Sequence, residues 1–86
     1  MKIVTIEPTP SPNSMKIVLN TELPAGTSFN YKKTDAETAP YPMSALLAIN
    51  GIQGIYHVMN FMAIEKNSDV EWEDILTSIE SIIPKK

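Results

Sequence analysis

Three prolines at alternate positions, Pro8, Pro10 and Pro12, stand near the start of the chain. Proline fixes φ and has no backbone N–H, so this spacing excludes a helix and prevents regular ladder hydrogen bonds. We therefore expect an extended, polyproline-like loop that ends in a turn at Pro12-Asn13. Whatever fold the chain adopts must place a stiff connection here.

The runs on either side of these prolines, residues 2–6 and 15–19, are rich in branched apolar residues. Such runs favour strands, and the intervening turn predicts that the two strands pair antiparallel. Further along, Pro24 and Gly26 indicate another turn, and residues 27–31 admit a short additional strand.

A short helix is predicted to begin at Pro42, because a proline at the first helical position loses no intrahelical hydrogen bond. Met43, Leu46 and Leu47 would share one face of this helix. Asn50-Gly51 is expected to end it in the left-handed conformation.

A tight hairpin is predicted for residues 52–66, with its turn around Met59-Asn60. In the second strand of this hairpin, side-chain alternation places Met62 and Ile64 on one side. The other side would carry Phe61, Ala63 and Glu65.

The last element is expected to be an amphipathic helix that ends before Pro84. Ser68 and Glu71 have the spacing of a capping box at its start. The apolar stripe of this helix comprises Trp72, Ile75, Leu76, Ile79, Ile82 and Ile83.

These elements predict one α+β domain spanning residues 1–86, with no internal repeat. The expected order is ββαββα: an antiparallel sheet of about four strands, with two helices packed on one face.

Composition removes many kinds of chemistry. The chain has no cysteine, which excludes disulfides, thiolate metal sites, thiolate-held iron–sulfur clusters and cysteine nucleophiles within it. The formal net charge is −3 and there is no arginine, which argues against nucleic acid as a partner. No apolar window reaches the roughly 18 residues of a membrane span, and an acid and a proline interrupt the N-terminus before a signal peptide could form. We expect a cytoplasmic protein that does not act on membranes.

No catalytic or metal site is expected. His57 is the only histidine, and no nucleophile or orienting carboxylate is evident for it, so a half-exposed strand histidine is the simpler interpretation. The carboxylates of the last helix are expected to be a solvated face. They are Glu71, Glu73, Asp74 and Glu80.

Methionine side chains adapt to irregular cores and to binding surfaces. For Met15, Met43, Met59 and Met62 we expect core positions, because a chain of 86 residues is short of core. No cofactor is expected.

The loop from Thr9 to Lys16 is the strongest candidate for a binding site. Its prolines limit the freedom of the unfolded chain, so ordering it on binding costs little. Asn13, Ser14 and Lys16 offer amide, hydroxyl and ammonium groups to an anion or a peptide carboxylate. The alternative is a stiff hairpin connection in which the Asn13 side chain caps its own turn.

From this loop onward the chain resembles a known family. The run Thr9-Pro10-Ser11-Pro12-Asn13-Ser14-Met15-Lys16-Ile17 is similar to a signature in the N-terminal domain of Nfu/NifU-type iron–sulfur scaffold proteins. The similarity continues through residues 44–52 and 58–66 and into the helix led by Trp72. It covers essentially the whole chain and implies an Nfu N-terminal domain.

In that family the cluster-binding cysteines lie in a separate C-terminal domain with a Cys-x-x-Cys motif. This chain shows neither that domain nor a cysteine, so the resemblance implies a non-catalytic accessory domain that contacts partner proteins. The partner would be a separate cysteine-bearing scaffold or a client protein.

Two hypotheses for the site remain. In the first, the domain docks a protein through the Pro12 to Lys16 loop and the hairpin at Asn60-Phe61. Lys16 would supply charge, Asn13 and Ser14 hydrogen bonds, and Phe61 an aromatic anchor. In the second, the same loop binds a small anion or phospho-ligand, without the arginine that usually strengthens phosphate binding.

Overall fold

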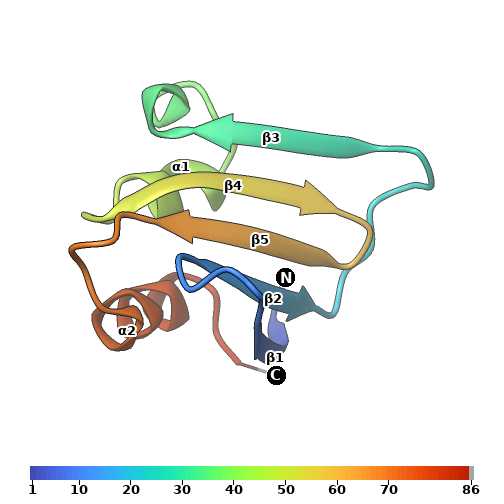
Figure 1. Cartoon of the computed structure of the whole chain (residues 1–86). Coiled ribbons are helices and arrows are strands. Elements are labelled where there is room, and N and C mark those ends of the chain that lie inside the picture. Colours follow the sequence, from blue (N-terminus) through green and yellow to red (C-terminus); the bar gives the residue numbers. More distant parts are fainter. Residues whose placement is uncertain (86) are drawn as a thin grey trace.

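The computed structural model describes residues 1–85 and contains one antiparallel sheet of five strands in the order β1-β2-β5-β4-β3. Figure 1 shows β3, β4, β5 and β2 side by side, with β1 turned away at one edge. The strands are β1 (Ile3–Pro8), β2 (Ser14–Leu19), β3 (Ser28–Lys32), β4 (Ile52–Val58) and β5 (Phe61–Lys66). The helices are a 3₁₀ turn η1 (Lys33–Asp35), α1 (Met43–Leu47) and α2 (Trp72–Ile82).

The α+β class and the antiparallel sheet are confirmed, whereas the expected count of about four strands and the order ββαββα are wrong. The additional strand is β3, which lies at the edge of the sheet beyond β4. Four of its five residues are exposed, although Phe29 and Tyr31 alternate with polar residues as in a strand. The short strand that the sequence admitted at residues 27–31 is thus present, and it pairs with β4 along its whole length.

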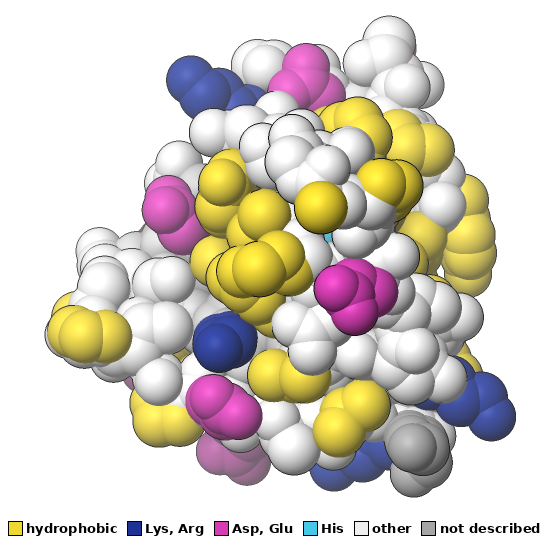
Figure 2. Space-filling view, turned by 90° about the vertical axis from the view of Figure 1, so that its right-hand side faces the viewer, with side chains coloured by type: hydrophobic (Ala, Val, Ile, Leu, Met, Phe, Trp, Pro, Cys, Tyr) yellow, Lys and Arg dark blue, Asp and Glu magenta, His cyan; other side chains and the backbone are white. Residues whose placement is uncertain are grey.

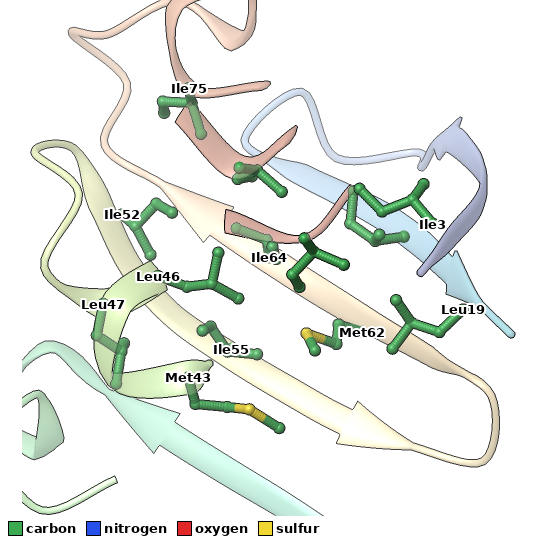
Figure 3. Close-up of a cluster of buried hydrophobic side chains, with 13 residues drawn as sticks. Ile3, Leu19, Met43, Leu46, Leu47, Ile52, Ile55, Met62, Ile64 and Ile75 are labelled. Carbon is green, nitrogen blue, oxygen red and sulfur yellow. The ribbon is translucent and has the colours of Figure 1, made fainter. Parts of the chain in front are cut away.

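Both helices pack on the same face of the sheet. Alternating residues of the central strands, including Ile17, Ile55 and Ile64, are at most 1% exposed. Figure 3 shows side chains of α1 and α2 meeting this row of apolar side chains over β4 and β5. The helices contribute Met43, Leu46, Leu47, Ile75 and Ile79 to one continuous core. We call this side of the sheet the covered face and the opposite side the open face.

The tight hairpin is confirmed. Val58 pairs directly with Phe61, so Met59 and Asn60 form a two-residue turn. Met59 has φ 49°, in the left-handed region that disfavours side chains with a Cβ. This turn fixes the register that puts Met62 and Ile64 on the covered face, as their alternation predicted.

The helix termini differ from expectation. Pro42 is the N-cap rather than the first residue of α1, and the helix ends at Leu47, before Asn50-Gly51. Gly51 has φ 100°, and a Cβ there would lie 2.7 Å from a methyl group of Val70. The glycine therefore serves the approach of the following β4 strand to the chain before α2.

The Ser68–Glu71 capping box does not form. Glu71 itself is the N-cap of α2, with no side-chain hydrogen bond to the helix. The N–H of Val70 donates to the Asn67 carbonyl, so the residues before Glu71 make a turn of their own. The helix therefore starts later than the capping-box spacing predicted.

Candidate functional site

The proline-rich loop is held by the hydroxyl of Thr9. The Thr9 Oγ1 accepts the N–H of Ser11 at 3.2 Å and lies 3.0 Å from the carbonyl oxygens of Ser11 and Ser14, to which it can donate. The N–H of Ser14 donates to the Ser11 carbonyl at 3.2 Å and closes the turn. The turn is thus capped by Thr9 and the backbone.

Asn13 does not cap its own turn, so that interpretation of its side chain is wrong. The Asn13 Oδ1 accepts a hydrogen bond from Lys66 Nζ at 3.1 Å, and its backbone carbonyl accepts the N–H of Lys66 at 2.9 Å. The indole N–H of Trp72 donates to the Pro12 carbonyl at 2.8 Å. The ammonium of Lys66 lies 5.6 Å from the centre of the Trp72 ring. The end of the loop is therefore fastened to β5 and to the start of α2.

Lys16 and Phe61 are brought together on the open face. The Lys16 ammonium lies 4.7 Å from the centroid of the Phe61 ring, within the range of a cation–π contact. Lys16 pairs with Ala63, and Phe61 pairs with Val18, so the two residues are diagonal neighbours across β2 and β5. On the next strand, Tyr56 pairs with Ala63 and is 43% exposed. Lys16, Val18, Tyr56, Phe61 and Ala63 form what we call the open-face cluster.

The other predicted site residues lie at the two ends of this cluster. Ser14 pairs with Glu65 at one end of the β2–β5 ladder, and Val18 pairs with Phe61 near the other. At about 3.3 Å per residue, the four steps from Ser14 to Val18 span roughly 13 Å. Pro12 and Asn13 lie beyond Ser14, and Asn60 lies in the turn beyond Phe61. The six predicted residues therefore do not converge on one point but follow the length of the open face.

Asn60 has a structural contact of its own. Its carbonyl accepts the N–H of Leu19 at 2.7 Å, and the neighbouring carbonyl of Met59 accepts the N–H of Leu23 at 2.9 Å. These bonds attach the β4–β5 turn to the end of β2 and the chain that follows it. Met59 itself is 53% exposed, so its expected core position is wrong, whereas Met43 and Met62 are buried.

Figure 2 views the molecule from the side that is on the right in Figure 1, where the β4–β5 turn lies. Hydrophobic side chains gather at the centre of this view, beside a lysine and between acidic side chains. The end of the sheet that carries the turn thus presents apolar surface.

Two shallow hollows border the site. One, of about 400 Å³, adjoins the loop and includes Asn13, Ser14, Glu65 and Lys66 in its lining. The other, of about 660 Å³, lies over β3 and β4 and includes Tyr56, Ala63 and Glu65. Lys66, Glu65 and Tyr56 were not singled out from the sequence. The hairpin register, which pairs Tyr56 with Ala63, was the signal that could have placed Tyr56 beside Phe61.

His57 is not the half-exposed histidine expected from its strand, because it is only 3% exposed and faces the core. Its Nδ1 has no hydrogen-bond partner among the described residues. Burial removes the imidazole from water and lowers its pKa from the usual 6.5. In residues 1–85 no group of three or more His, Asp or Glu side chains is arranged to hold a metal ion.

The fold and the site define a small α+β domain with one covered sheet face and one open face that carries a lysine, aromatic and aliphatic side chains. No helix within the described part of the chain has the length and apolar character required to cross a membrane. Residues 4–86 match the family model described as the scaffold protein Nfu/NifU N terminal. The chain belongs to this family.

Relatives agree with this assignment. The chain is 53% identical over 79 residues to the uncharacterized protein YpgR of Bacillus subtilis, with 92% of this chain covered. It is 48% identical over 81 residues to conserved virulence factor C of Staphylococcus aureus, with 94% of this chain covered. In both cases the match spans only 21% of the relative's length.

Solved structures share the fold over nearly the whole chain. The crystal structure of protein SAV1430 from Staphylococcus aureus is 36% identical, with a TM-score of 0.87 and coverage of 95% of this chain and 98% of that one. The solution structure of SeR13 from Staphylococcus epidermidis is 30% identical, with a TM-score of 0.71 and coverage of 94% and 93%.

Proposed function

We propose that this domain is a non-catalytic interaction module that docks a partner protein in cytoplasmic iron–sulfur cluster assembly. The partner is a cysteine-bearing scaffold with a Cys-x-x-Cys motif. The 86 residues contain no cysteine, so they offer no thiolate to a cluster, and the cluster's ligands must come from outside them. The family described as scaffold Nfu/NifU N terminal supports the pathway.

The observation that carries the proposal is the contact of Lys16 with Phe61 on the open face. An aromatic ring beside a cation, with aliphatic Val18 next to it, is the composition of an interface anchor rather than of ordinary solvated surface. Phe61 is only partly covered, so a partner that removes its remaining surface from water would gain from the hydrophobic effect.

The loop from Thr9 to Ser14, beside the open-face cluster, is ordered before any partner binds. Hydrogen bonds from Trp72 and Lys66 to Pro12 and Asn13 hold it against the body of the domain. A surface that is already in place loses little conformational entropy on binding, which favours affinity. In the docked complex, Asn13 and Ser14 border the anchor and supply polar contacts at its rim.

The test is the affinity of the purified domain for the purified Cys-x-x-Cys scaffold of the same cell, measured by calorimetry. The double variant Lys16→Ala, Phe61→Ala should bind at least ~10-fold more weakly, which is the scale of an interface hot spot. The matched control is the double variant Lys2→Ala, Tyr41→Ala. It removes one lysine and one exposed aromatic ring that lie outside the open-face cluster. Circular dichroism would establish that both variants fold.

Two results would count against the proposal in different ways. If the wild-type domain does not bind the scaffold, the function is wrong. If the open-face variant and the control bind as tightly as the wild type, the docking surface lies elsewhere.

A second candidate, binding of a small anion or phospho-ligand, is favoured by one observation: the Lys66 ammonium lies beside Asn13 in the hollow next to the loop. Glu65 lines the same hollow and would repel an anion, and Lys16 is engaged with Phe61. Titration with inorganic phosphate, followed by NMR, tests this candidate. Chemical-shift changes at Asn13, Ser14 and Lys66 would support it, and their absence at millimolar phosphate would end it.

A further inference from the structure

The two edges of the sheet are treated differently. At the β1 edge, the register shifts between Ile3 and Thr5, and Pro8 supplies no N–H. The N–H of Ile3 donates to the Pro84 carbonyl at 2.9 Å, and Ile3 forms a parallel bridge with Lys85. A bulge, a proline and a covering segment are the usual ways in which proteins block an edge strand.

Within residues 1–85 the β3 edge has no bulge, proline or covering segment, and its single charge, Lys32, stands at the very end of the strand. Its residues, Ser28–Lys32, contain no proline and pair with β4 in an unbroken register. Phe29 is 42% exposed and stacks on Tyr31 with 6.0 Å between the ring centroids. This strand therefore presents a regular, partly apolar edge.

The backbone of Asn30 points away from β4. In the two-residue hairpin, Val58 bonds toward β5, so by alternation His57 and Ile55 bond toward β3 and engage Phe29 and Tyr31. The N–H of Lys32 confirms this parity, because it donates to Asp35 Oδ2 at 2.9 Å rather than to β4. The N–H and carbonyl groups of Ser28 and Asn30 consequently face outward, with no partner among the described residues.

We propose that this edge pairs with the β3 edge of a second copy of the chain, antiparallel and centred on Asn30. The N–H and carbonyl of Asn30 would then exchange hydrogen bonds with those of Asn30 in the second copy. The Ser28 N–H would donate to the Lys32 carbonyl of the second copy. The two sheets would become one continuous sheet related by a two-fold axis.

The strand is complementary to itself in this register. Phe29 of one copy lies opposite Tyr31 of the other on the same face, which is a favourable aromatic cross-strand pair. Each Lys32 lies opposite a serine, so no like charges meet. The Asp35 carboxylate, which already satisfies the Lys32 N–H, marks the end of the ladder. This self-complementarity is the reason for choosing a second copy over an unrelated peptide.

A single-cysteine crosslink tests the geometry directly, because the chain has no cysteine of its own. In Asn30→Cys the two new residues face each other across the axis, at the roughly 5.5 Å Cα separation of a hydrogen-bonded antiparallel pair, which a disulfide can span. Oxidation should convert most of this variant to a covalent dimer. Val4→Cys, at the exposed position in the bulge of the blocked β1 edge, is the control and should remain largely monomeric.

Sedimentation equilibrium of the unmodified chain supplies the second test. Asn30→Pro removes the outward N–H without touching the pairing with β4 and should raise the dimer dissociation constant at least 10-fold. Asn30→Ala keeps the N–H and should dimerise nearly as the wild type does. The proposal is overturned if the wild type stays monomeric at millimolar concentration, if the proline and alanine variants behave alike, or if the two cysteine variants crosslink equally.

Discussion

The two faces of the sheet are built from the same strands but have opposite roles. Along β5, Met62 and Ile64 are fully buried on the covered face. Phe61 and Ala63, which alternate with them, are only partly covered on the open face. Both helices lie over the first set, and nothing in residues 1–85 lies over the second in the same way. An antiparallel sheet tolerates this arrangement because one packed face is enough to hold it.

The difference shows how a small chain divides its apolar residues. The covered face takes branched aliphatic side chains, which fill the space beneath α1 and α2. The open face keeps an aromatic ring, a tyrosine and a lysine, which contribute less to the core and more to a surface that can be recognised. Stability should therefore depend on one face and binding on the other.

The largest effect is expected on the covered face. Ile64→Ala removes a fully buried side chain and leaves a cavity, and should lower the free energy of unfolding by about 2–5 kcal/mol in urea denaturation. The neighbouring Phe61→Ala, on the open face, should cost only about 1 kcal/mol, because its ring is partly in water already. Equal losses from the two substitutions would abolish the proposed division between the faces.

A smaller, pH-dependent effect should come from His57, which among residues 1–85 is the one polar side chain buried on the covered face. Because burial lowers its pKa in the folded protein, the unfolded chain binds a proton first as the pH falls below about 6.5. Stability should therefore decrease from about pH 6.5 downward until the folded protein also protonates. His57 pairs with Met62 of β5 and with Phe29 of β3, and neither of these two side chains carries a charge.

Urea denaturation between pH 7.5 and pH 5 would measure this loss. In His57→Leu the histidine contribution should vanish, which leaves only the slope due to the carboxylates. An unchanged pH dependence in that variant would show that the imidazole does not carry the effect.

The smallest effect is expected at the turn that joins β4 to β5. This turn sets the register of the hairpin and so decides which of its side chains lie on the covered face. Met59→Gly relieves the left-handed φ of 49° and removes a side chain that is already half exposed, so it should raise stability by up to about 1 kcal/mol. Met59→Ala, which keeps the Cβ, is the control and should give no such gain. Thermal unfolding of both variants provides the comparison, and a glycine variant less stable than the wild type would mean that the methionine packs in a way its exposure does not reveal.

Much of this fold could be predicted locally. The proline spacing, the Val58–Phe61 turn and the alternation around Met62 each depend on neighbours a few residues away, and each was correctly placed. The start of α2 could not be placed in the same way, and residues 27–31 only admitted the strand that became β3. Both depend on long-range partners: β3 on its pairing with β4, and the turn before Glu71 on the packing of Val70 against Gly51.

The site shows the same limit. The sequence indicated Lys16 and Phe61 as functional candidates but gave no means of knowing that they touch, because the pairing of β2 with β5 joins residues far apart in the chain. It assigned Asn13 a choice between ligand binding and its own turn, whereas the folded chain gives that side chain to Lys66.

By itself, then, the sequence determined the types of the main strands and helices, the hairpin register and the absence of any thiolate, because these follow from backbone restrictions, side-chain periodicity and composition. The tertiary structure alone decided that β3 is a free edge, that His57 is buried and that Lys16 lies over Phe61. These features arise where distant segments pack together, and packing is a property of the whole chain rather than of any local run of residues.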